Sequence, residues 1–114
     1  MTKESKFGTS KTNEYRVTED GKIRVYKKST GELKKEYDGI YNRERQKTVV
    51  SWVSEEAGKE VTVDVAKLVA QAFVPNPKGL RWIMHKNKVL DDNRAENLEW
   101  SSSQDRRFDY WDKV

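Results

Sequence analysis

The segment that most limits the fold of this chain is a short amphipathic stretch closed by two prolines. Apolar residues recur at helical spacing over Val65–Phe73, which predicts a helix with one apolar face. That face would carry Val65, Leu68, Val69, Ala72 and Phe73. Asp64 stands at the N-cap position, and Pro75-Asn76-Pro77 ends the helix because proline cannot continue the hydrogen-bond ladder. The chain is thus predicted to hold a short, sharply ended helix between runs of β-forming residues.

Runs rich in β-branched and aromatic residues surround this helix and are separated by turn residues. Glu19-Asp20-Gly21 is typical of a tight turn within a hairpin. The predicted strands cover residues 14–18, 22–26, 33–37, 47–54, 60–63, 81–85 and 97–101, with a polar loop over residues 86–96. Ser102 and Asp105 approximate a capping box that opens a last helix. The fold class is therefore α+β, with a small antiparallel β-sheet followed by a helix and a strand–loop–strand–helix unit.

The same pattern divides the chain into three parts. Residues 1–13 are polar and lack a period, so a flexible leader is expected there. Residues 14–63 form a β-rich module, and residues 64–114 hold the helix and the strand–loop–strand–helix unit. Because the chain has 114 residues, these last two parts are expected to pack together as one compact unit.

Composition excludes several kinds of protein. The chain has no cysteine, which rules out disulfides, thiolate nucleophiles and cysteine-bound zinc. No apolar run approaches the length of a membrane span and no secretory signal is found, so a cytoplasmic location is expected. The protein is also expected to be a monomer. The net charge of +4 is concentrated in residues 1–48, which hold 13 Lys and Arg against 8 Asp and Glu. A basic N-terminal half suits a surface that follows phosphates.

Two stretches of sequence carry a more specific signal. Residues 68–77 read L-V-A-Q-A-F-V-P-N-P, and residues 93–100 read N-R-A-E-N-L-E-W. Together with His85, the only histidine, they resemble the core of the HNH homing-endonuclease family, which is common in phage and intron-borne genes. The resemblance implies a ββα finger that holds one divalent metal ion. Residues 15–63 resemble the small β module that precedes this finger in phage proteins.

What the resemblance implies about chemistry depends on four positions. His85 falls at the position of the general base that activates water, and Asn97 at that of a structural asparagine that orients the histidine. Met84 stands where the family places a metal ligand, and a thioether is a poor ligand for Mg²⁺. If the family's spacing holds, Arg106 replaces the second ligand with a permanent cation. We therefore expect a phage-type DNA-binding protein whose cutting activity is impaired or lost, with no bound cofactor.

The sequence leaves an active enzyme open as an alternative. Asn87 stands where the family commonly has an aspartate, two residues after the histidine. A shift of one residue would bring Asp105 inward, and Asp105 with Asn87 would then be the candidate ligands for Mg²⁺ or Mn²⁺. Under this alternative the protein is a divalent-metal-dependent HNH endonuclease that nicks or cleaves DNA.

Basic residues at several places are expected to bind phosphates of double-stranded DNA, the partner that the resemblance implies. These candidates are Lys22, Arg24 and Lys27 on the hairpin, Arg43 and Arg45 before the next strand, Lys86 and Lys88 after His85, and Arg106. The lysines would alternatively protect strand edges. A third function remains open from another class, a phage inhibitor that binds a host enzyme in the host cytoplasm, because fold does not determine function.

Overall fold

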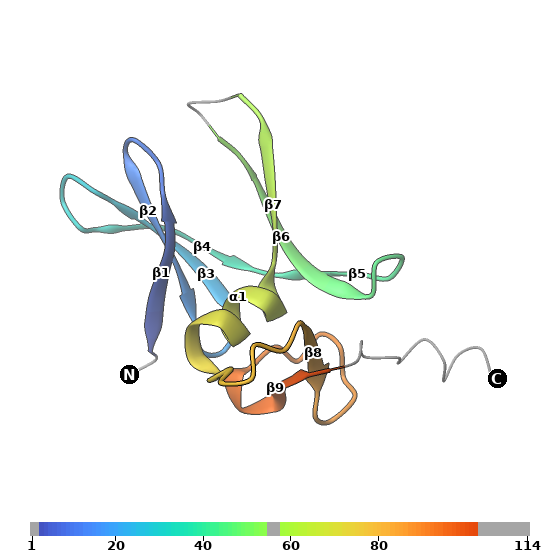
Figure 1. Ribbon diagram of the computed structural model, residues 1–114. Coiled ribbons are helices and arrows are strands. Elements are labelled where there is room, and N and C mark those ends of the chain that lie inside the picture. The colour runs from blue at the N-terminus through green and yellow to red at the C-terminus, as the bar shows by residue number, and fades with distance from the viewer. Residues whose placement is uncertain (1–2, 55–57, 103–114) are drawn as a thin grey trace.

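The computed structural model describes residues 3–54 and 58–102 (Figure 1). Four strands form an antiparallel sheet in chain order: β1 (Glu4–Thr9), β2 (Asn13–Thr18), β3 (Lys22–Lys27) and β4 (Leu33–Asp38). A three-stranded sheet follows with β5 (Ile40–Asn42), β6 (Lys47–Val53) and β7 (Glu60–Asp64). Next come α1 (Val65–Phe73), the paired strands β8 (Trp82–His85) and β9 (Leu98–Ser101), and a 3-10 turn at Ala95–Asn97 between them. The described residues thus combine antiparallel sheets with one α-helix, which agrees with the predicted α+β class.

The first strand corrects one expectation from the sequence. Residues 1–13 are predicted to form a flexible leader, but residues 4–9 form the edge strand β1, which pairs antiparallel with β2. Glu4 of this strand contacts Arg16 on β2 and Arg24 and Tyr26 on β3, and Phe7 packs against the core. Because these partners come from other strands, a polar segment without a period becomes ordered. The boundary between the β-rich module and the rest stays a prediction.

Gly39 connects the four-stranded sheet to the three-stranded sheet between β4 and β5. A Cβ atom here would overlap the Cγ2 methyl of Thr48 on β6 and would lie 3.2 Å from Cγ2 of Val65. Glycine is therefore needed for the close approach of this link to β6. From the link, the hairpin of β6 and β7 and the strands of the first sheet extend as two diverging arms (Figure 1).

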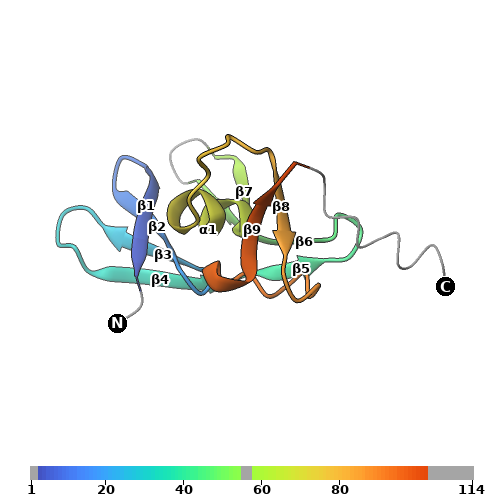
Figure 2. The same ribbon diagram turned by 60° about the horizontal axis from the view of Figure 1, so that its bottom comes forward.

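α1 lies at the base of the two arms, next to the hairpin of β8 and β9 (Figures 1 and 2). Asp64 caps it as predicted, because its carboxylate accepts a hydrogen bond from the N–H of Lys67 at 3.3 Å. The buried core consists of Val17, Ile23, Val50, Val65, Ala66, Val69, Ala70 and Leu98. Ala72, predicted on the buried face, is exposed. The helix instead buries the small side chains of Ala66 and Ala70, which allow sheets to pack closely on several sides.

Three tryptophans lie in strands and differ in burial. Trp52 and Trp100 are half-buried and pack against the core, whereas Trp82 is 39% exposed. Alternation along β8 explains the difference, because Ile83 is the neighbour that packs inward. Among the described residues, no helix is long and apolar enough to cross a membrane.

Candidate functional site

His85 is the last residue of β8, and its side chain contacts the side chain of Asn93. His85 is 7% exposed and Asn93 is 5% exposed. The Nε2 atom of His85 lies 2.7 Å from Oδ1 of Asn93. Pairing with Leu98, which is 1% exposed, places the histidine against the core. Asn93 opens the N-R-A-E-N-L-E-W stretch that carries the resemblance, but the sequence alone assigns it no contact with His85.

Asn97, the predicted structural asparagine, is buried and fastens the loop between β8 and β9. Its Oδ1 accepts a hydrogen bond from the N–H of Asn87 at 3.0 Å. Its Nδ2 donates to Oδ1 of Asn87 at 3.0 Å and to the carbonyl of Asp92 at 2.8 Å. Its own carbonyl accepts from the N–H of Lys86 at 2.8 Å. Asn97 therefore joins the two ends of the loop, while its role in orienting His85 stays a prediction.

Asp92 is engaged by donors from its own loop. Arg94 donates from Nε and Nη2 to the two carboxylate oxygens at 2.8 and 2.9 Å, a bidentate arrangement that is stronger than a single hydrogen bond. Nδ2 of Asn87 adds a third bond at 2.8 Å. The bond from Arg94 is the main reason that the pKa of Asp92 falls to about 2, although partial burial acts in the opposite direction. Asp92 is thus a carboxylate whose two oxygens already have donors.

The turn between β2 and β3 supports the same loop from the first sheet. The N–H of Ala95 donates to the carbonyl of Glu19 at 2.7 Å. Gly21 has a φ of +90°, and a Cβ atom added there would lie 3.4 Å from the carbonyl oxygen of Asn93. The N-terminal sheet therefore helps to position the residue that contacts His85.

A cavity of about 300 Å³ opens beside His85. Four basic residues line it, namely Arg45, Lys47, Lys67 and Arg81. Asp64 is the one carboxylate among the described residues of the lining, and it lies 3.8 Å from Nζ of Lys47. Within residues 3–54 and 58–102, the other three cations form no ion pair, although the Arg81 guanidinium lies 5.9 Å from the ring centre of Trp82. This excess of positive charge in a concave site attracts an anion.

The predicted phosphate contacts are divided among several places. Arg45 lines the cavity beside His85. Lys86 and Lys88 are exposed on the loop that follows His85, and Lys27 and Arg43 are exposed outside the cavity lining. Arg106 and Asp105, like the last predicted helix, lie outside the described residues.

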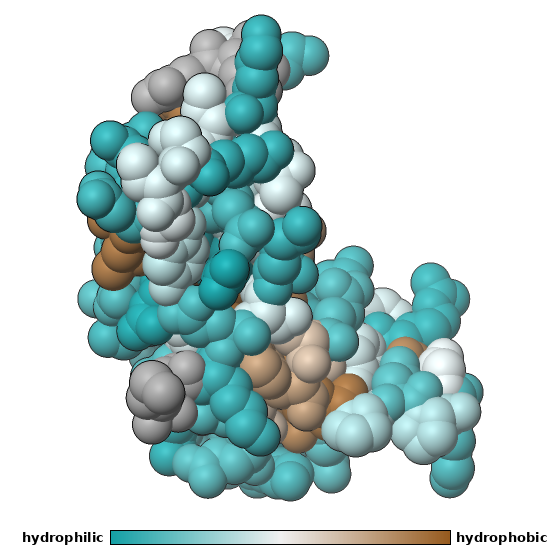
Figure 3. Space-filling model, turned by 90° about the vertical axis from the view of Figure 1, so that its left-hand side faces the viewer, coloured by the Kyte–Doolittle hydropathy of each residue, from teal (hydrophilic) through white to brown (hydrophobic). Residues whose placement is uncertain are grey.

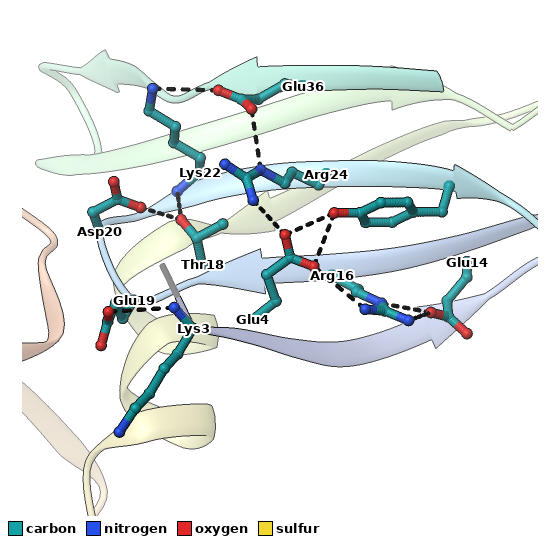
Figure 4. Close-up of polar contacts among 11 residues, drawn as sticks. Lys3, Glu4, Glu14, Arg16, Thr18, Glu19, Asp20, Lys22, Arg24 and Glu36 are labelled. Atoms are coloured by element: carbon teal, nitrogen blue, oxygen red, sulfur yellow. Dashed lines mark hydrogen bonds and ion pairs between the residues drawn. The ribbon is translucent and has the colours of Figure 1, made fainter. Parts of the chain in front are cut away.

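Lys22 and Arg24 lie in a network of ion pairs on the face of the first sheet opposite Ile23 and Val25 (Figure 4). Nζ of Lys22 is 3.3 Å and Nε of Arg24 is 3.1 Å from the carboxylate of Glu36. The whole network comprises Arg16, Lys22 and Arg24 with Glu4, Glu14, Glu36 and Asp38. Carboxylates outnumber cations here, so this face is hydrophilic but not strongly positive. Figure 3 shows that the side of the molecule that carries β1 is mostly hydrophilic.

Among the residues that the structure describes, the side chains around His85 do not form a Mg²⁺ site. Met84 offers a thioether and does not line the cavity. Asp92 is already engaged by Arg94 and Asn87. In the part of the chain that the structure describes, no group of three or more His, Asp or Glu side chains is placed to hold a metal ion.

Comparisons with known proteins identify a fold but no family. No protein-family model and no curated protein matches the sequence. Among solved structures, the chain is similar to the HNH homing endonuclease I-HmuI, in a structure that concerns DNA binding and cleavage by that enzyme. The TM-score is 0.51 at 24% sequence identity, and the match covers 87% of this chain and 51% of the endonuclease. The chain therefore has an HNH-like fold and spans about half the length of the enzyme that it matches.

Proposed function

We propose that this protein binds double-stranded DNA on an HNH-like scaffold and that its ability to cut DNA is impaired or lost. The cavity beside His85 is the observation that carries the proposal. Among the described residues, four basic side chains and one carboxylate line it, and three of the basic ones form no ion pair there. A backbone phosphate is an anion of suitable size for such a site, and DNA presents phosphates in a regular row.

The chemistry of the lining explains how binding would persist without cutting. Arg45 and Arg81 are guanidinium groups, which bind phosphate oxygens in a bidentate manner. These fixed cations supply the charge that a metal ion would otherwise place beside the phosphate. They do not lower the pKa of a bound water as a metal ion does, so they do not create the attacking nucleophile.

Two further features support impaired chemistry. Met84 precedes His85 and does not line the cavity, so the expected ligand position supplies no oxygen donor. Asp92, the half-buried carboxylate of the loop, is engaged by Arg94. If Arg106 occupies the second ligand position, as the sequence predicts, its positive charge would also disfavour binding of a metal ion.

The proposed binding of double-stranded DNA is tested by measuring affinity for a labelled duplex. Fluorescence anisotropy reports this affinity over a range of salt concentrations. The Arg45→Gln/Arg81→Gln variant should weaken binding and reduce the salt slope by about 2, because two phosphate contacts are lost. Arg43→Gln is the matched control for Arg45, since it removes the same charge from the same turn but outside the cavity lining. Equal losses in Arg43→Gln and Arg45→Gln single variants would reject the cavity as the binding site.

An active endonuclease is the alternative, and the position of His85 favours it. The ring lines the cavity and is oriented by Asn93, as a general base beside a bound phosphate would be. Incubation of supercoiled plasmid with the protein in Mg²⁺ or Mn²⁺ separates the two proposals. Metal-dependent nicking that disappears in His85→Ala would establish the active enzyme, and intact plasmid would support the impaired one.

A further inference from the structure

A second cleft lies between the two arms of the molecule, away from His85. Its volume is about 440 Å³, within the range of ligand-binding pockets. The turn after β1 and parts of β2, β3, β4 and β6 line it, and none of its described lining residues also lines the cavity beside His85. A ligand of this cleft would therefore contact other described residues than a phosphate at the first site.

Three aromatic rings form a row in the lining of this cleft. The ring centres of Tyr15 and Trp52 are 5.1 Å apart, with the planes inclined by 22°. Those of Tyr37 and Trp52 are 6.3 Å apart, inclined by 21°. All three side chains are half-buried, so part of each remains open to solvent. Such a surface suits a flat ligand that packs against aromatic rings.

The charge of the cleft selects the kind of flat ligand. Among the described residues that line it, Lys34 and Lys35 are the charged ones and none is acidic. Neither lysine forms an ion pair with a described residue, and Nζ of Lys35 lies 5.8 Å from the ring centre of Tyr37. Lys34 reaches this face because the pairing of β3 with β4 shifts its register between Val25 and Tyr26. The ligand should therefore be planar and carry negative charge close to its ring.

We propose that this cleft binds a nucleotide of single-stranded DNA, with the base against the aromatic row and the phosphate near Lys34 and Lys35. Bases offer the flat surface and phosphates the charge, and this pairing of aromatic rings with lysines is how single strands are bound without sequence preference. In duplex DNA the base faces are stacked on one another, so the cleft selects an unpaired nucleotide. The site goes beyond the proposed duplex binding and needs none of its residues.

The test compares a short thymidine strand with an abasic strand of equal length, by fluorescence anisotropy at low and physiological salt. The thymidine strand should bind about tenfold more tightly, since only it can stack. The Lys34→Gln/Lys35→Gln variant should lose about tenfold in affinity for the thymidine strand. Lys3→Gln/Lys6→Gln is the matched control, because it removes the same charge from exposed positions outside the cleft, and it should change affinity less than about twofold.

Each other outcome overturns the proposal. Equal binding of the abasic strand would show that no base enters the cleft, and equal losses in the two lysine variants would show a general charge effect. Absence of strand binding would reject the site outright. Duplex binding is measured with the same proteins. Loss of duplex binding alone, as expected for Arg45→Gln/Arg81→Gln, concerns the cavity beside His85 and leaves the strand site intact.

Discussion

Asp92 and Arg94 show how a loop of short polar residues is kept in one conformation. The two side chains form a bidentate pair beside Asn97, and Asn87 donates a further hydrogen bond to the same carboxylate. Arg94 also contacts Glu96 at 2.7 Å. Ionisation of Asp92 is therefore coupled to the order of the loop that holds His85.

This coupling predicts a stability loss in acid. The pKa of Asp92 is about 2 in the folded protein, against an ordinary value of 3.8. A lowered folded pKa means that the stabilisation is fully present above pH 3.8 and is lost as the pH falls towards 2. The contribution is on the order of 1 to 2 kcal/mol, because solvent screens the half-exposed Arg94. Urea unfolding should show that Asp92→Asn has lost this free energy at neutral pH. Its free energy of unfolding should also fall less steeply than that of the wild type as the pH is lowered from 3.8 towards 2.

Asp91→Asn is the control for that measurement, since Asp91 is exposed on the same loop and the change removes the same charge. If the free energy of unfolding falls as steeply with decreasing pH in Asp92→Asn as in the wild type, the acid sensitivity belongs to other carboxylates. The network around Glu4 is the main competitor, because Tyr26 and Arg24 lower the pKa of Glu4 in spite of its burial.

Single residues differ in how far the sequence reveals them. His85 and Asn97 stand in a recognisable register, and they lie at the two ends of the loop that joins β8 to β9, while their roles stay predictions. Asn93 belongs to the same stretch, but its contact with His85 was not predicted because it depends on how the loop closes. Lys22 and Arg24 are predicted as phosphate contacts, but their ion pairs with Glu36 and Glu4 follow from strand register. The sequence of one strand shows its basic residues but does not show which carboxylates on other strands will pair with them.

The link between β4 and β5 allows a prediction about the joint between two sheets. Gly39→Ala should destabilise the protein by roughly 1 to 3 kcal/mol, because the new methyl overlaps Cγ2 of Thr48. Thr48→Ser removes that methyl, so the double variant should recover part of the loss relative to the sum of the single changes. Thermal and urea unfolding of the four proteins measures the coupling. Strictly additive effects would show that the link moves away from β6 without cost.

Secondary structure was predictable where a segment carries its own signals. The turn at Glu19-Asp20-Gly21 and the prolines after α1 are local features, and the hairpin and helix end lie where they indicate. β1 and the three-residue strand β5 are different. Their residues lack a clear alternation, and pairing with β2 and β6 makes them strands. The buried face of α1 was likewise only partly predictable, because sheets pack on it from several directions.

The three sheets meet on one helix, which bears on how the whole chain unfolds. α1 packs against strands of all three sheets. The carbonyl of Glu19 binds Ala95, and Nε1 of Trp100 donates to the carbonyl of Val74 at 3.0 Å. A β-rich module and a histidine-bearing unit are expected from the sequence to form one compact body, and these contacts are the physical links that would couple them.

We therefore predict a single cooperative transition in urea. The imidazole NMR signals of His85, the only histidine, should disappear at the same urea concentration at which tryptophan fluorescence and far-UV circular dichroism change. Gly21→Ala, which strains a turn with φ of +90° that abuts Asn93, should shift all three probes together by about 1 kcal/mol. Gly31→Ala is the matched control, because φ is +76° there but no atom lies within 4 Å of the added Cβ. Loss of the His85 signals ahead of the other probes, in the wild type or selectively in Gly21→Ala, would mean that the loop and hairpin unfold independently of the sheets.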